Sequence, residues 1–328
     1  MTTPTLPLGI DVSKKVFDVI LQYAGRESHG VFDNTPQGFA ALRKWLKKRG
    51  VKRVHACLEA TGRYGDELAL FLHDQGHLVS VVNPAQIKAY AESKLVRNKT
   101  DKGDARLIAE FCETQNPPLW TPSDPAIREL QALVRQLDAL RQMRTQELNR
   151  LQSGVPSPVV VESLKNHLAF LDEQIQHIEQ SIRDLIDHHP DLKRQKDLLT
   201  SIPGIGDTTA AILLAEVGNF HDFPRASKLV AYAGLSPHQH HSGSSSRRRS
   251  RLSRLGKRSL RKALYLPALA AMRFNPIIRA FAARLKQRGK HTMTVISAAM
   301  RKLLTLAYGV LKSGLPFDPN YRSRHAMA

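Results

Sequence analysis

Two apolar runs near the N-terminus alternate in polarity, and each ends beside an acidic residue. The first, at residues 8–12, contains Asp11, and the second, at residues 54–58, leads directly into Glu59. A period of two residues is typical of a β-strand with one buried face. The pattern restricts the N-terminal third to folds that contain a sheet and that carry acids at the ends of its strands.

The rest of residues 6–115 predicts an α/β unit. A run of three early strands followed by alternating helices and strands is typical of a ribonuclease-H-like mixed sheet. The segment at 78–82 is expected to end at Asn83-Pro84. Strands are predicted at residues 6–10, 16–22, 28–32, 54–58 and 78–82, and helices at 35–49 and 66–75.

A second pair of acids lies at a predicted helix start. Asp101 and Asp104 follow Thr100, which is a good N-cap residue, and their spacing places them on one helix face. Each of the four acids has an ordinary explanation, because helix dipoles favour acids at this end and strand ends often carry turn residues. Together, four carboxylates match the oxygen ligands of Mg²⁺, and one or two such ions can support phosphodiester cleavage. Asp11, Glu59, Asp101 and Asp104 are therefore the predicted catalytic and metal-binding residues.

The charge of the chain is concentrated in its C-terminal third. The formal net charge is +20, and from residue 219 onward 22 Lys and Arg side chains face only two acids. Such asymmetry predicts a polyanionic partner, because phosphate neutralisation supplies most non-specific nucleic-acid affinity. No signal peptide, membrane span or amphipathic membrane segment is expected. Cys57 and Cys112 are predicted to be buried and reduced in a cytoplasmic protein.

Prolines at 117, 118 and 122 predict a boundary, followed by a long helix at residues 127–151 and a second after the loop at 153–158. The second helix repeats apolar residues at 4-3-4-3 spacing, which predicts a coiled-coil seam. The pattern leaves open whether this seam packs on the first helix or between subunits. The repeating residues are Leu164, Leu168, Leu171, Ile175, Ile178, Ile182 and Leu185.

The region after residue 198 is predicted to be mainly helical, with helices within 257–313 and a mobile tail. Gly204 and Gly206 lie before an apolar helix, and such a loop can present backbone N–H groups to a phosphate, as in a helix-hairpin-helix element. An ordinary helix start explains the same pattern. The predicted nucleic-acid contacts are Lys99, Gly204, Gly206, Arg247, Arg248, Arg249, Arg251, Arg254, Lys257, Arg258 and Arg261.

A serine-rich stretch at residues 242–246 precedes three arginines. One serine there could attack phosphorus while neighbouring guanidinium groups neutralise the developing charge. The base is left open between His240, His241 and the distant carboxylates, and a simple phosphate-binding loop remains the alternative. A zinc site at these histidines and His238 is not expected, because no matching Cys/His pair accompanies them.

Taken together, these motifs resemble the DEDD insertion-sequence transposases, which are recombinases that use a non-coding bridge RNA. The resemblance spans nearly the whole chain. Its motifs are residues 9–11, 59–64, 82–84, 97–105, 202–206, 233–237, 242–243 and 259–261.

The resemblance implies a RuvC-like domain at 1–118, a coiled-coil region at 119–198, a transposase domain at 199–315 and a flexible tail at 316–328. It places the acidic quartet on the four carboxylates named above and the catalytic serine on Ser242. It also implies a covalent phosphoserine intermediate, bound Mg²⁺, donor and target DNA, and a homo-oligomer (dimer or tetramer) with a composite active site. Ser244, Ser245 and Ser246 replace the usual Gly-Lys after the Ser-Gly pair, so an adjacent serine stays open as nucleophile.

The sequence thus favours a bacterial, cytoplasmic, nucleoid-associated transposase. A second hypothesis is a metal-dependent RuvC-like nuclease or junction resolvase, in which water attacks and Ser242 only binds phosphate. A third is a non-catalytic nucleic-acid-binding assembly factor. Covalent attachment of protein to DNA separates the first hypothesis from the other two.

Overall fold

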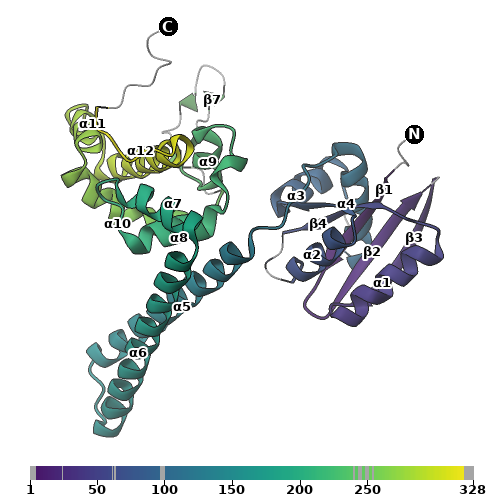
Figure 1. Ribbon diagram of the computed structural model, residues 1–328, viewed down its shortest axis with the longest axis horizontal. Coiled ribbons are helices and arrows are strands. Elements are labelled where there is room, and N and C mark those ends of the chain that lie inside the picture. The colour runs from purple at the N-terminus through teal and green to yellow at the C-terminus, as the bar shows by residue number, and fades with distance from the viewer. Residues whose placement is uncertain are drawn as a thin grey trace. The chain divides into compact units, whose positions relative to one another are not determined.

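The computed structural model describes residues 5–23, 25–60, 62, 64–96, 100–238, 241–242, 246–247, 251–252 and 255–320. The chain divides into two compact units, Met1–Pro122 and Ser123–Ala328 (Figure 1). Several predicted contact residues, together with a candidate base and two alternative nucleophiles, lie outside the described residues. These are Lys99, Arg248, Arg249, Arg254, His240, Ser244 and Ser245.

The first unit is built on the predicted mixed sheet. The strands β1 (Leu6–Val12), β2 (Val16–Tyr23) and β3 (Arg26–Asp33) form an antiparallel meander. The strands β4 (Val54–Glu59) and β5 (Leu78–Val82) extend it in parallel with β1, giving the order β3-β2-β1-β4-β5.

The two faces of this sheet pack on different helices. Leu8 and Ile10 of β1 contribute to a core with α1 (Pro36–Lys48) and α2 (Asp66–Asp74). The opposite face packs on α4 (Asp101–Gln115), which buries Ala105 and Ala109 against Ile20 of β2. Because successive side chains on a strand point to opposite faces, the positions between the core residues face α4.

The thiols of Cys57 and Cys112 are buried on this α4 face, as predicted. Cys57 lies on β4 and Cys112 on α4, and their side chains are hydrogen-bonded to each other. This bond, followed by burial, raises the pKa of Cys57. The pair adds a contact between the strand that ends in Glu59 and the helix that begins with Asp101.

One helix of the first unit was missed by sequence reasoning. The pattern predicts that β5 ends at Asn83-Pro84, which is correct, but these residues also begin α3 (Pro84–Ser93). The Asn83 side chain accepts a hydrogen bond from the Ala85 N–H at 2.9 Å. Proline is well tolerated at the first helical position, because its missing N–H would have no helical partner there.

The second unit begins with two long helices, α5 (Pro125–Gln152) and α6 (Pro158–His188). The helix α6 packs back on α5 (Figure 1), which is the first of the two arrangements that the heptad pattern left open. Ion pairs Arg141–Glu179 and Arg144–Asp172 join the two helices in an antiparallel sense. Of the repeating apolar residues, Leu164, Leu171 and Ile182 are buried and the others are half-buried.

The remainder of the second unit is mainly helical, as predicted. Its helices form one apolar core with the N-terminal half of α5 and the C-terminal end of α6. They are α7 (Pro190–Thr200), α8 (Asp207–Val217), the short η1 (Phe220–Asp222), α9 (Ala226–Tyr232), α10 (Arg258–Phe274), α11 (Pro276–Gln287) and α12 (Thr292–Ser313).

Among the described residues, α12 is the one helix long and apolar enough to cross a membrane by length and composition, and half of its apolar segment is buried within the unit. Val295, Leu303 and Ala307 of α12 have no exposed surface and belong to the core. The helix therefore serves here as a central packing element of the second unit.

Candidate active site

Asp11 and Glu59 lie at the same end of two neighbouring parallel strands. Ile10 of β1 pairs with Leu58 of β4, so the two acids follow at adjacent positions. Ile10 and Leu58 point into the core beneath α1 and α2. The acids alternate with them and therefore face α4.

Gly9 allows α4 to lie against β1. A Cβ atom at this position would lie 2.1 Å from the Ala105 carbonyl oxygen and 2.3 Å from the Ala109 nitrogen. Only a residue without a side chain permits this approach of helix backbone to strand backbone. The packing carries the first turn of α4, with Asp101 and Asp104, to the carboxyl end of β1.

Two further contacts fix the start of α4. The Thr100 hydroxyl accepts a hydrogen bond from the Gly103 N–H at 3.1 Å, as the predicted N-cap requires. The Arg106 guanidinium forms a bidentate pair with Glu27 of β3 and holds the pKa of that carboxyl below its ordinary value. The acids of α4 are thus held by a cap at the helix end and by an ion pair one turn further on.

The four predicted carboxylates converge electrostatically on Asp11. Burial, followed by the charges of Asp104, Asp101, Glu59 and Asp18, raises the pKa of Asp11 from 3.8 to about 6. Neighbouring negative charges have this effect because each disfavours ionisation of the next. The structure therefore brings together acids from β1, β4 and α4 that are up to 93 residues apart in the chain.

The fifth acid, Asp18, was missed by sequence reasoning. It lies on β2 directly opposite Asp11 in the antiparallel register, and cross-strand partners point to the same face of a sheet. Asp18 is 8% exposed and its Oδ1 lies 2.7 Å from Nε2 of His29 on β3. The sequence did contain one indication of this residue: Asp18 is an acid within the otherwise apolar run of residues 16–21.

Asn34 joins the loops that follow the two acid-bearing strands. Its side-chain amide donates to the Ser13 carbonyl at 3.0 Å and to the Tyr64 carbonyl at 2.9 Å. Ser13 follows β1 and Tyr64 lies in the segment after β4. A single side chain therefore ties together the backbone near Asp11 and the backbone near Glu59, which the sequence pattern did not indicate.

The donor chemistry of this cluster suits a hard divalent cation. Within the described parts of the chain, no three Asp, Glu, His or Cys side chains stand close enough together to hold an ion as they are placed. The cluster nevertheless concentrates hard oxygen ligands, and burial, followed by repulsion from the neighbouring acids, raises the pKa of Asp11. Mg²⁺ requires few protein ligands because it keeps several waters, and Asp11, Glu59, Asp101 and Asp104 are the residues that would hold it.

The predicted serine belongs to the second unit. Ser242 lies in β7 (His241–Ser242), which pairs with β8 (Ser246–Arg247) so that Ser242 is opposite Ser246. At the base of this hairpin, β6 (Pro237–His238) pairs with β9 (Arg251–Leu252). Backbone pairing with β8 thus fixes the position of Ser242 opposite Ser246.

Some predicted phosphate contacts have internal partners. Gly204 has a φ of +107°, and a Cβ there would lie 2.7 Å from the Ala271 Cβ of α10. The Lys257 ammonium pairs with the Glu216 carboxylate at 3.1 Å, and Arg261 donates to the Ala233 carbonyl at 3.1 Å. These contacts give Gly204, Lys257 and Arg261 structural roles within the unit.

Gly206 and Arg258, in contrast, are exposed. A Cβ at Gly206 would meet open space. Gly206 is the N-cap of α8, and Arg258 is the first residue of α10. These two positions of the predicted interface are accessible to a phosphate.

Comparison with known proteins places the chain in a family. Residues 8–156 match the model of the DEDD transposases of IS110 type, and residues 196–283 match the "Transposase IS116/IS110/IS902 family". A pilin gene-inverting protein of Moraxella bovis is 35% identical over 314 residues, which cover 95% of this chain and 97% of that protein. The transposase for insertion sequence element IS1111A of Coxiella burnetii is 26% identical over 274 residues, covering 72% of this chain and 70% of that protein.

Among solved structures, Thermus thermophilus RuvC in complex with a Holliday junction substrate is similar over 36% of this chain and the whole of that chain, with 14% identity and a TM-score of 0.26. The family matches define the protein as a DNA transposase, an enzyme of DNA recombination. The chain belongs to the IS110 family of DEDD transposases, which confirms the resemblance seen in its motifs.

Proposed function

We propose that this transposase is an RNA-guided recombinase that cleaves and rejoins DNA through a covalent phosphoserine at Ser242, with Mg²⁺ held by Asp11, Glu59, Asp101 and Asp104. The observation that carries the proposal is the convergence of these carboxylates on Asp11, whose pKa is about 6. Elements distant in sequence gather negative charge at one point, which costs stability and is typical of a functional site.

The serine step exchanges one phosphate ester for another. The Ser242 Oγ forms a bond to phosphorus as one P–O bond of the DNA backbone breaks. The serine proton leaves, and the departing DNA oxygen takes up a proton to become a free hydroxyl. Rejoining reverses these steps when a hydroxyl of a different strand attacks the phosphoserine. Because each step exchanges one phosphate ester for another, no nucleotide cofactor is needed as an energy source.

The carboxylates provide the metal-binding part of the site. Bound Mg²⁺ would supply Lewis-acid stabilisation of the charge on the phosphoryl oxygens. Asp18 and Asn34 contribute to the cluster without being proposed metal ligands. Asp18 adds negative charge beside Asp11, and Asn34 fixes the spacing of the two strand-end loops. With carboxylates in the first unit and the serine in the second, a composite site in a dimer or tetramer is part of the proposal.

The partners follow from charge and from the family. After residue 218 the chain has 22 Lys and Arg side chains and only two acids, and this positive charge suits binding to DNA and RNA backbones. The resemblance supplies the bridge RNA as the guide to donor and target DNA. The relative named for pilin gene inversion supports a site-specific DNA rearrangement as the outcome. A cytoplasmic, nucleoid-associated location accords with these partners.

The test compares Ser242→Ala with Ser246→Ala, because the two serines are direct cross-strand partners in one hairpin. Each full-length variant is incubated with element-end DNA, the co-purified RNA and Mg²⁺, and covalent adducts are resolved on denaturing gels. We expect Ser242→Ala to abolish the adduct and Ser246→Ala to retain it. Undiminished adduct in Ser242→Ala removes this serine from the mechanism.

The same gels separate the nuclease hypothesis from recombination. DNA cleaved by the wild-type protein without any attached protein indicates attack by water and supports a junction-resolving nuclease. Sequencing the co-purified RNA tests guidance separately. A discrete RNA encoded beside the gene supports it, whereas random fragments contradict it.

A further inference from the structure

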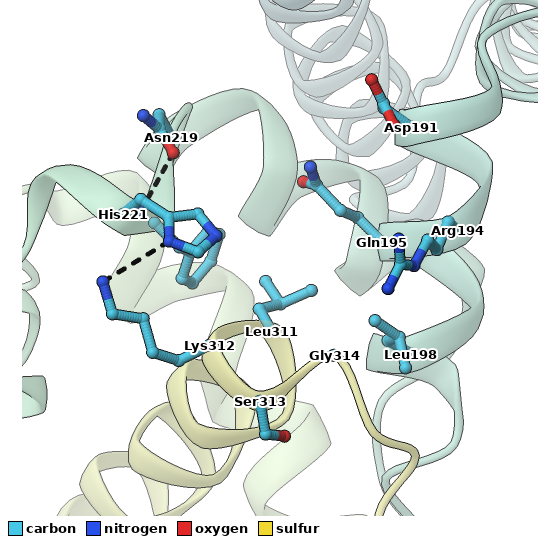
Figure 2. A pocket seen from close by; sticks show the side chains of 11 residues that line it. Asp191, Arg194, Gln195, Leu198, Asn219, His221, Leu311, Lys312, Ser313 and Gly314 are labelled. Atoms are coloured by element: carbon cyan, nitrogen blue, oxygen red, sulfur yellow. Dashed lines mark hydrogen bonds between the residues drawn. The ribbon is translucent and has the colours of Figure 1, made fainter.

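A pocket of about 340 Å³ lies in the second unit (Figure 2). Its walls come from α7, the η1 turn and the C-terminal end of α12. The floor is formed by Leu198, Phe220 and Leu311, which are buried. Ligand pockets typically combine such an apolar floor with a few convergent polar groups, and this volume lies within their usual range.

Two cationic side chains and one histidine line the opening. Arg194 comes from α7, His221 from η1 and Lys312 from α12 (Figure 2). The Lys312 ammonium lies 3.5 Å from Nδ1 of His221. Asp191 is the one acid in the described lining, and the Arg194 side chain forms no ion pair or hydrogen bond with the described residues. The rim therefore offers positive charge to a phosphate.

The wall beside the floor offers hydrogen-bonding groups. The last carbonyls of a helix have no N–H partner in a following turn, and α12 ends at this pocket with Leu311, Lys312 and Ser313. Gln195 points its amide toward the cavity (Figure 2). Unpaired carbonyls accept from amino groups, and an amide both donates and accepts, so this wall suits the polar edge of a nucleobase.

We propose that this pocket binds one unpaired nucleotide of the nucleic acid handled by the transposase, with its base on the apolar floor and its phosphate at Arg194 and Lys312. The proposal rests on the proposed function, since a recombinase separates and exchanges strands and so exposes unpaired bases. Stacking and apolar contact bind single strands without regard to sequence, while cations follow the backbone. DNA and RNA strands share this chemistry.

Two variants test the pocket in the full chain. Arg194→Gln/Lys312→Gln removes the rim charges, and Lys165→Gln/Arg183→Gln removes two exposed charges on α6 as a matched control. Gln195→Trp fills the cavity without changing charge. Fluorescence anisotropy is measured with a single-stranded oligonucleotide, as DNA and as RNA, and with a DNA duplex.

We expect the rim variant to lower single-strand affinity at least tenfold and the α6 control to lower it less than threefold. Gln195→Trp should weaken single-strand binding at least fivefold and leave duplex binding unchanged. Preference for the DNA or the RNA strand identifies the source of the nucleotide. Equal losses in rim variant and control, or unchanged single-strand binding in Gln195→Trp, would show that the cations only stabilise the end of α12 and would overturn the proposal.

Photocrosslinking gives a second readout. An oligonucleotide that carries 4-thiothymidine is irradiated with the protein, and the modified peptides are identified by mass spectrometry. Adducts at residues 219–221 are expected in the wild type and absent in Gln195→Trp. The serine adduct assay is run in parallel. A pocket variant that loses single-strand binding but still forms the serine adduct has lost the function of the pocket alone. Failure of the wild type to form any adduct contradicts the proposed function and leaves the pocket proposal to the binding data.

Discussion

Replacing Asp11 by Asn should stabilise the metal-free protein while it destroys the reaction. A pKa raised from 3.8 to about 6 corresponds to roughly 3 kcal/mol of unfavourable interaction for the ionised group. Asp11 is only half-buried, so solvent screening reduces this figure to about 1 kcal/mol. A gain of that size raises the midpoint of thermal unfolding by about 2–5 °C.

The pH dependence of this gain follows from the sign of the shift. Below pH 3.8 Asp11 is protonated in both the folded and the unfolded state, so it does not lower the free energy of unfolding. Above about pH 6 it is ionised in both states, and the full destabilisation of the folded state is present. The advantage of Asp11→Asn should therefore be full at pH 8 and shrink as the pH falls from 6 to 4. Adding Mg²⁺ should narrow the difference, because a bound ion stabilises the wild type and binds the variant less well.

Thermal unfolding in a chelator at several pH values measures the effect. Glu92→Gln, which removes an exposed acid of α3, is the matched control and should change the midpoint by less than 1 °C at either pH. A neutral or destabilising Asp11→Asn at pH 8, or a gain that does not vary with pH, would refute the inference that burial and the neighbouring carboxylates together disfavour ionised Asp11.

Three further predictions concern the residues that hold the site. Gly9→Ala should cost about 1–3 kcal/mol and abolish the covalent adduct, because the new Cβ displaces α4; a variant with normal denaturant midpoint and activity contradicts the close packing. Asn34→Ala should cost about 1–2 kcal/mol through two lost hydrogen bonds and slow adduct formation, and an unchanged rate on gels argues against a positioning role. His29→Ala should lower the urea midpoint by leaving Asp18 without its partner, and Asp18→Asn in the same chain should recover part of the loss; additive effects of the two changes would show that the pair is not coupled.

Local patterns predicted the elements of the first unit and the positions of its four acids. Alternation identified β1 and β4, and Thr100 marked the start of α4, because these signals depend on neighbours in the chain. The same kind of reasoning missed α3, since proline can end one element and begin the next. It also missed Asp18, because a single acid within an apolar run does not reveal which strand will lie beside it.

The sequence by itself determined the family, the mixed sheet, the helical second half and the concentration of positive charge after residue 218. Only the tertiary structure decided that Asp18 stands opposite Asp11, that Asn34 ties two loops and that Lys257 and Arg261 serve internal contacts. The physical reason is range. Propensity, capping and periodicity act within a few residues, whereas repulsion between carboxylates and the approach of α4 to Gly9 arise between segments about a hundred residues apart, brought together by packing.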